Sequence, residues 1–222
     1  MQIEKNLQKL KELAVSSGRS YGEDGRVVNN NELNGSFRLL REAGNADNWS
    51  ALFPNTSVEQ FSSPILGGAV TLTNGLLEDG SSMGLMLLDL DEPLDITNYL
   101  NGGLRAIIAS PSPANITTIE ISLVSELVIG ENVQLATWEG EFEFNFDNPT
   151  LDGADVAVAT GYARFNDFNR FTINEGLTLD LTKITKIAVS VVADLANLET
   201  TVSGLSLFAN NQHGKRQAKQ QG

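Results

Sequence analysis

The 222-residue chain contains no cysteine and a single histidine, His213. These two shortages exclude a disulfide framework, a thiolate nucleophile and zinc sites built from cysteine or several histidines. No stretch approaches the roughly 18 apolar residues of a membrane-spanning helix, so we expect no membrane partner. Charged residues such as Glu4 and Lys5 stand where a secretion signal needs an apolar run. The sequence therefore predicts a protein without a secretion signal.

Basic residues are also scarce, and their distribution is uneven. The net charge of the chain is −13. Residues 1–45 balance at +1 and residues 211–222 at +3, which leaves −17 on residues 46–210. Because such a body repels phosphate backbones, we expect no nucleic-acid binding through it. The charge favours solubility, and it would also let basic arms dock on acidic neighbouring copies.

The N-terminal segment 2–15 has the pattern of an amphipathic helix. Its apolar residues are spaced 4, 3 and 4 apart, as in the seam of a short coiled coil. They are Ile3, Leu7, Leu10 and Ala14. Two heptads are compatible with packing on the protein's own body and with self-association, so both readings stay open. Residues 20–48, rich in Gly, Asn and charge, predict an extended arm with one short strand at 36–40.

From Trp49 onward the pattern is almost entirely that of β-strands, with apolar residues at every second position. The apolar positions of the four clearest strands are Ile119, Ile121 and Leu123; Phe142, Phe144 and Phe146; Leu177, Leu179 and Leu181; and Ile187, Val189 and Val191. The continuous runs 84–88 and 105–109 predict central strands covered on both faces. We expect three parts: an N-terminal helix and arm (1–48), a β-sandwich (49–210) and a flexible basic tail (211–222).

Two segments carry a family resemblance. The stretch from Leu88 to Leu100, LDLDEPLDITNYL, is followed by a strand at 104–109, and the segments 181–191 and 202–208 look like paired closing strands. This arrangement resembles galactose-binding-like jelly rolls, which include many carbohydrate-binding modules. The chain departs from that family at Ser203-Gly204, where an Asp-Asn pair is usual. The resemblance implies an all-β fold, an antiparallel jelly-roll sandwich, here with a short N-terminal helix and flexible arms.

A glycan-binding sheet needs exposed aromatic rings that stack on sugar rings. Residue parity predicts that the outward positions of three strands carry none: Thr118, Glu120 and Ser122; Glu141, Glu143 and Asn145; Ala188 and Ser190. Trp138 shares the parity of the core positions. The remaining candidates for exposed rings are Tyr99, Tyr162 and Trp49, each near a predicted turn, and each is also compatible with packing in the core or at an edge.

The resemblance also makes calcium a candidate ligand, since jelly rolls of this kind often hold a structural calcium ion. Four acidic residues crowd one segment, and hard oxygen ligands are what this ion prefers. They are Asp89, Asp91, Glu92 and Asp95. The same residues also fit a solvated acidic edge that blocks strand pairing. No other cofactor is expected.

The sequence contains few patterns that could form a catalytic site. The string Gly80-Ser81-Ser82-Met83-Gly84 matches a nucleophile elbow, but a strand follows it where a helix is needed, and His213 lies in the tail. Glu141 and Glu143 share a strand face, as a glycosidase pair could, but without aromatics on that face. The sequence therefore predicts a protein that is not an enzyme.

Two functions remain. The arms, the lack of cysteine and the abundance of Asn and Gly resemble accessory proteins of phage heads and tails. The main prediction is thus a structural virion protein, located in the virion or in the cytoplasm before assembly, whose partners are other copies of itself and other structural proteins. The alternative is a carbohydrate-binding module that attaches a particle or an enzyme to a glycan surface.

Overall fold

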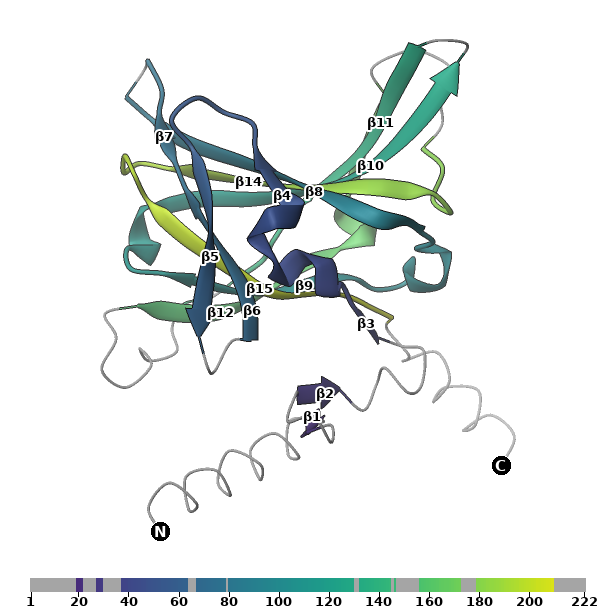
Figure 1. Ribbon diagram of the computed structural model, residues 1–222, viewed down its shortest axis with the longest axis horizontal. Coiled ribbons are helices and arrows are strands. Elements are labelled where there is room, and N and C mark those ends of the chain that lie inside the picture. The colour runs from purple at the N-terminus through teal and green to yellow at the C-terminus, as the bar shows by residue number, and fades with distance from the viewer. Residues whose placement is uncertain are drawn as a thin grey trace.

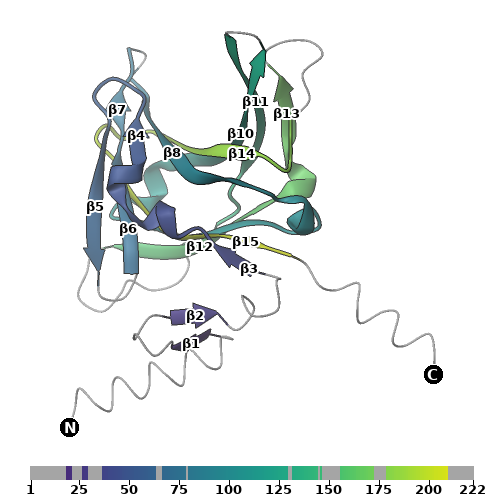
Figure 2. The ribbon, with the colours of Figure 1, turned by 45° about the vertical axis from the view of Figure 1, so that its right-hand side comes forward.

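The structure is a computed structural model, and it describes residues 19–21, 27–29, 37–63, 67–78, 80–129, 132–144, 146, 156–172 and 179–209. These residues form strands joined by turns and short 3₁₀ helices. Two sheets face each other across a common core (Figures 1 and 2). The predicted antiparallel β-sandwich of the jelly-roll type is therefore confirmed. None of the helices in the described part of the chain is long and apolar enough to cross a membrane.

One sheet has seven strands, and every strand pair in it is antiparallel. In spatial order its strands are β13 (Asn169–Thr172), β11 (Asn132–Glu141), β10 (Ile116–Ile129), β14 (Ile184–Ala193), β8 (Ser82–Leu94) and β4 (Trp49–Ala51), with β7 (Gly75–Leu76) also paired to β8. The sheet is curved: β8 and β14 cross its middle, while β11 and β7 rise at its two ends (Figure 1).

The second sheet has six strands, again all antiparallel. Its order is β12 (Ala157–Arg164), β9 (Gly103–Ser110), β15 (Glu199–Phe208), β6 (Gly67–Thr73) and β5 (Ser57–Ser63), with β3 (Phe37–Leu39) paired to the end of β15. A bulge interrupts β15 between Ser203 and Ser206, where Gly204 has a φ of +60°. The positive φ explains the glycine there, because L side chains rarely adopt it.

The core follows the period-2 pattern read from the sequence. Ile119, Ile121 and Leu123 of β10 are fully buried, and they pair with buried residues of β14. Each such side chain contributes on the order of 1.5–3 kcal/mol through burial. Trp138 lies in the core, as its parity predicted.

Three strand predictions need correction. β11 ends at Glu141, so the described residues 142–144 and 146 do not continue it as a strand. Residues 179–181, predicted to lie in a strand, form coil and turn. The runs 84–88 in β8 and 105–109 in β9 are not covered on both faces, because alternate side chains in each run are only half-buried. Phe142 and Leu179 are buried as the pattern predicted, whereas Phe144, Phe146 and Leu181 are half-buried and Leu177 lies outside the described residues.

On the outer face of β14, burial of the side chains is determined by the central position of the strand in the sheet and not by their polarity. Ala188 and Ser190 were expected to be exposed, yet their exposed fractions are 9% and 7%. β14 lies between β8 and β10, so longer neighbouring side chains cover these two small residues.

Short 3₁₀ helices complete the fold. They are η2 (Arg41–Gly44), η3 (Ala46–Asn48), η4 (Thr97–Tyr99), η5 (Pro113–Asn115) and η6 (Phe165–Asp167). Leu40 and Ala43 lie in the core, and β3 pairs with β15. The sandwich therefore begins before the predicted boundary at residue 49, because this polar-looking segment still supplies core residues. The predicted strand at 36–40 corresponds to β3.

β1 (Arg19–Tyr21) and β2 (Val27–Asn29) form a separate two-stranded antiparallel sheet. In the described part of the chain they pair only with each other and with no strand of the sandwich. The predicted N-terminal helix at 2–15 and the tail at 211–222 lie outside the described residues.

Gly103 is required by close backbone packing, and its substitution tests the register of three strands. It pairs with Arg164 of β12 and with Phe208 of β15, and an added Cβ would lie 2.0 Å from the carbonyl oxygen of Ala163. We expect Gly103→Ala to lower the free energy of unfolding by about 2–3 kcal/mol, because backbone atoms cannot yield locally. Urea denaturation measures this change.

Gly161 on β12 is the matched control. A Cβ there would meet side-chain atoms only, Ile108 Cδ1 at 2.7 Å and Phe142 Cδ1 at 3.2 Å, so Gly161→Ala should cost less than Gly103→Ala, about 1 kcal/mol. Equal losses for the two variants would contradict the strand packing described.

Candidate functional site

Only one of the three predicted exposed rings is exposed. Tyr162 of β12 has an exposed fraction of 40%. Trp49 is 6% exposed, and its Nε1 donates a hydrogen bond to the carbonyl oxygen of Ala43 at 3.1 Å. Tyr99 of η4 is 8% exposed and belongs to the core. Trp49 and Tyr99 are therefore unavailable for stacking on a ligand, because both rings are buried in the core.

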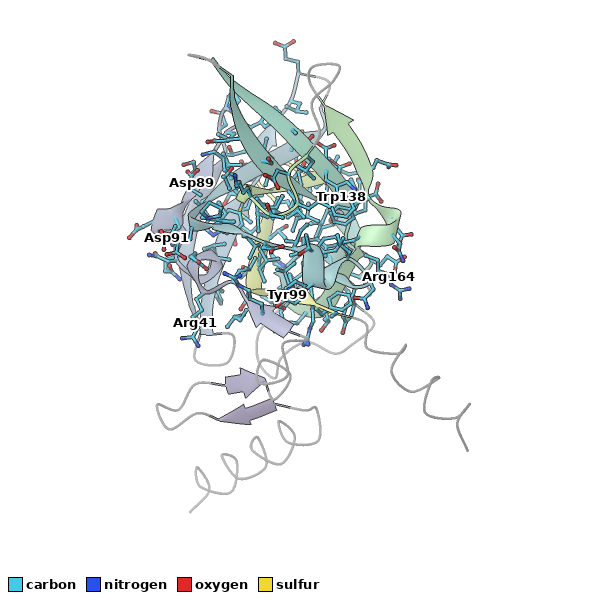
Figure 3. All side chains as sticks on the ribbon, turned by 90° about the vertical axis from the view of Figure 1, so that its right-hand side faces the viewer. Arg41, Asp89, Asp91, Tyr99, Trp138 and Arg164 are labelled. Atoms are coloured by element: carbon cyan, nitrogen blue, oxygen red, sulfur yellow. The ribbon has the colours of Figure 1, made fainter. Side chains whose placement is uncertain are left out.

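The four acidic residues predicted for calcium do not converge. Asp89 forms an ion pair with Lys186, whose Nζ also lies 3.3 Å from Glu126 Oε1. Asp91 and Glu92 are exposed on β8. Figure 3 shows Asp89 and Asp91 on the side of the body opposite to Arg164. No group of three or more acidic or histidine side chains in the described ranges could hold a metal ion.

Asp95 has a local structural role. Its Oδ1 accepts hydrogen bonds from the Thr97 backbone N–H at 2.9 Å and from Thr97 Oγ1 at 2.6 Å. These hydrogen bonds from Thr97 hold the pKa of the Asp95 carboxyl below its usual value. The calcium donor set thus does not fit the structure, because its members serve an ion pair, a turn and the solvated surface.

The four apolar residues predicted for assembly, Ile3, Leu7, Leu10 and Ala14, lie outside the described residues, so that role stays a prediction. Ser82 of the nucleophile-elbow string is fully buried, and its Oγ donates to the carbonyl oxygen of Leu195 at 2.6 Å. A buried, hydrogen-bonded serine does not serve as an exposed nucleophile. The string is therefore a structural feature of β8.

Tyr162 lies where the two sheets are joined. Glu143, just past the end of β11, forms an isolated antiparallel bridge with it: the Glu143 N–H donates to the Tyr162 oxygen at 2.8 Å, and the Tyr162 N–H donates to the Glu143 oxygen at 2.9 Å. Directly opposed residues place their side chains on the same face, and so do residues two apart on a strand. Glu143, Tyr162 and Arg164 therefore share the outer face of β12.

A pocket of about 250 Å³ opens beside this bridge. Its lining comes from the end of β11, the end of β12, η6 and the start of β13. The lining residues are Gly140, Glu141, Glu143, Arg164, Asp167 and Asn169. The volume is below the 300–1,000 Å³ typical of drug-sized ligands, so the pocket suits one small ring.

An aromatic cluster in the core supports the turn that carries Asp167 and Asn169 of the pocket lining. The ring centroid of Trp138 lies 5.0 Å from that of Phe165 and 5.2 Å from that of Phe168, and Trp138 Nε1 donates to the carbonyl oxygen of Phe168 at 3.3 Å. With Phe165 and Phe168 turned into the core, the polar residues between and beside them point outward. Figure 3 shows Trp138 inside the body and Arg164 at its edge.

Gly140 and Phe142 also help to position the residues that line the pocket. A Cβ on Gly140 would lie 2.2 Å from the Phe168 ring, so this ring packs directly on the backbone of β11. Phe142 is 4% exposed, and its burial turns Glu141 and Glu143 outward on either side of it. Two residues apart along an extended chain, these carboxylates are separated by about 7 Å at the backbone.

An acidic surface adjoins the pocket on the outer face of the seven-stranded sheet. Glu120 of β10 is directly opposite Glu141, and Glu139 lies two residues before it on β11. Partial burial raises the pKa of Glu120 above its usual value, and the like charges of Glu141 and Glu139 raise it further. The ionised form of Glu120 is thus disfavoured in the folded protein.

Glu120→Gln tests this electrostatic arrangement. A raised folded-state pKa means that stability is lost as the pH rises through it, so the variant should be more stable at pH 7, by about 0.2–1 kcal/mol. This gain should shrink as the pH falls and vanish below the usual glutamate value of 4.5. Thermal unfolding of both proteins between pH 3.5 and pH 7 measures it, and a pH-independent difference would refute the electrostatic cause.

Sequence reasoning named Tyr162, Glu141 and Glu143 but missed Arg164, Asp167 and Asn169. A signal for them was present in the segment 164–169, where two phenylalanines three residues apart are interleaved with polar residues. The pattern predicts a tight turn with two inward rings, but it does not say which strand the outward side chains will meet.

Comparison with known proteins identifies the fold. No protein-family model and no curated protein matches the sequence. Among solved structures, the solution structure of CtCBM11 is similar with a TM-score of 0.52 and 15% identity, over 80% of this chain and 97% of the other. The family 11 carbohydrate-binding module from Clostridium thermocellum, in complex with a β-1,3-1,4-mixed-linked tetrasaccharide, is similar at 13% identity with a TM-score of 0.46, covering 78% and 95%.

A third structure, CBM27-1 from Caldicellulosiruptor saccharolyticus in complex with mannohexaose, matches at 14% identity with a TM-score of 0.41, over 78% of this chain and 96% of that one. At these identities the similarity to CtCBM11 shows the fold alone. The chain thus has the β-sandwich fold found in carbohydrate-binding modules.

Proposed function

We propose that this protein is a non-catalytic carbohydrate-binding module that holds an oligosaccharide at the pocket beside Tyr162. One observation carries the proposal: the exposed Tyr162 is bridged through its backbone to Glu143, which lines a small pocket together with carboxylate, guanidinium and amide groups. Sugar rings offer apolar C–H faces and a rim of hydroxyl groups. An aromatic ring covers the former, and the polar side chains of the pocket hydrogen-bond the latter.

The Tyr162 ring is held in place. Its centroid lies 5.8 Å from that of Phe208, at an interplanar angle of 90°. Such edge-to-face pairs contribute about 0.5–1.5 kcal/mol beyond their buried area. Its backbone is fixed by the bridge to Glu143 and by pairing with Arg105 of β9. A ring ordered in this way loses little conformational freedom when a ligand binds.

The likeness in fold to CtCBM11 supports this proposal over the virion role favoured by the sequence. The pocket itself supports binding over hydrolysis. A glycosidase holds its two carboxyl groups on either side of the scissile bond in a cleft, whereas Glu141 and Glu143 are both exposed and lie two residues apart on one segment.

Substitution of Tyr162 tests the proposal. The wild-type protein should bind a subset of neutral and amine-bearing glycans on an array. Tyr162→Ala should weaken binding of those glycans about tenfold or more, whereas Tyr162→Phe should retain most of it, because the stacking face is unchanged. Isothermal titration calorimetry measures the affinities.

Phe61 provides the matched control. It is 41% exposed and lies on β5, at the opposite edge of the same sheet. Phe61→Ala should leave glycan affinity unchanged. A wild-type protein that binds no glycan, or equal losses for both alanine variants, would refute a binding site at Tyr162.

An assembly role is the second candidate, and one observation favours it. The β1–β2 pair adds no strand to the sandwich, so this part of the arm is separate from either sheet. Deleting residues 1–36 spares β3 and should leave the sandwich folded. If the arm mediates self-association, light scattering will show an oligomeric full-length protein and a monomeric truncated one. Equal masses would remove this candidate.

A further inference from the structure

The charged and polar side chains that line the pocket are exposed. Within the described part of the chain, the side chains of Glu141, Glu143, Arg164, Asp167 and Asn169 take part in no hydrogen bond or ion pair. Acidic residues and an arginine in one pocket would be expected to pair with each other, as Lys186 pairs with Asp89 and Glu126. Among the described residues, a ligand would therefore displace no hydrogen bond or ion pair of these groups.

The charge of the lining decides which ligand it suits. Three carboxylates and one guanidinium give the pocket a formal charge of −2, and Glu139 and Glu120 add to the negative potential beside Glu141. A uronic acid or a sulfated sugar would be repelled by this field. A positively charged ligand would be attracted to it.

The spacing of the carboxylates distinguishes between a metal ion and an organic cation as the ligand. Carboxylates that hold a calcium ion converge on one point, and no group of three or more acidic or histidine side chains that could do so occurs in the ranges described. Here the carboxylates are spread around a space of about 250 Å³. This arrangement suits an organic cation about the size of one sugar ring, with hydroxyl groups that reach the more distant side chains.

We propose that the pocket beside Tyr162 selects a cationic amino sugar, with its ammonium group at the carboxylate of Glu143, the lining residue that bridges to Tyr162. The inference rests on the proposed function, since it specifies the ligand class of the same site. The ammonium forms a charge-assisted hydrogen bond with the Glu143 carboxylate, and Glu141 and Asp167 add to the negative potential around it. Arg164 and Asn169 bind hydroxyl oxygens, and the Tyr162 ring covers an apolar face of the adjoining sugar.

The experiment compares three trisaccharides by isothermal titration calorimetry: the β-1,4-linked trimers of glucosamine, N-acetylglucosamine and glucose. At pH 6 the glucosamine trimer should bind about tenfold more tightly than the other two, the difference expected between a charged and a neutral hydrogen bond. At pH 9 the advantage should disappear, because an amine with a pKa near that of an α-amino group, about 7.7–8.0, has lost its proton.

Charge variants separate the pocket from the acidic body as a whole. Glu143→Gln should weaken binding of the glucosamine trimer about fivefold and leave the glucose trimer within about twofold. Arg164→Gln should strengthen binding of the glucosamine trimer, because it removes the one positive charge of the lining. Glu59→Gln, an exposed carboxylate on β5, removes the same charge far from the pocket and should change nothing.

The outcomes are distinguishable. Equal affinity of the three trimers, with a loss for Tyr162→Ala, would overturn the amino-sugar inference and leave the proposed function standing. Equal losses for Glu143→Gln and Glu59→Gln would show general attraction to an acidic protein and would also overturn it. If no glycan binds, or if Tyr162→Ala binds like the wild type, the proposed function itself fails.

Discussion

The packing of Trp138 against Phe165 and Phe168 is the contact on which the candidate site depends. It holds the tight turn between β12 of one sheet and β13 of the other, so it connects the two sheets at the edge where the pocket opens. The Trp138 hydrogen bond to the Phe168 carbonyl oxygen fixes the turn further. Because the rings occupy the inner side of the turn, Arg164, Asp167 and Asn169 are directed outward. The pocket is therefore a consequence of core packing at an edge of the sandwich.

The sequence predicted the fold class well, for a physical reason. Alternation of apolar and polar residues is a local signal, and it correctly placed Ile119, Ile121 and Leu123 in the core. It failed where burial depends on distant parts of the chain: Ala188 and Ser190 are covered because β14 is central, and Trp49 and Tyr99 belong to the core, Trp49 with a hydrogen bond to the carbonyl oxygen of Ala43. Strand order is a long-range property, and no local pattern in the chain encodes it.

The candidate site was predicted in part for the same reason. Tyr162 and the pair Glu141 and Glu143 were recognised separately, by residue type and spacing. Their meeting depends on a single bridge between Glu143 and Tyr162, two residues that are far apart in the sequence. The acidic segment from Asp89 to Asp95 shows the opposite case: the residues are close in sequence, but strand geometry and local hydrogen bonds direct them to different partners. Proximity along the chain was thus a poor guide to a shared site.

The residues that line the pocket differ from the core residues, such as Phe165 and Phe168, that support it, and this has a consequence for how the protein could change during evolution. The polar side chains that line the pocket are exposed, whereas the side chains that support it belong to the core. Mutations of the lining can therefore alter ligand preference at little cost in folding, even to a pocket of reversed sign. Mutations of the aromatic rings would instead be removed by selection for stability. The same backbone could in this way serve a series of related proteins with different sugars.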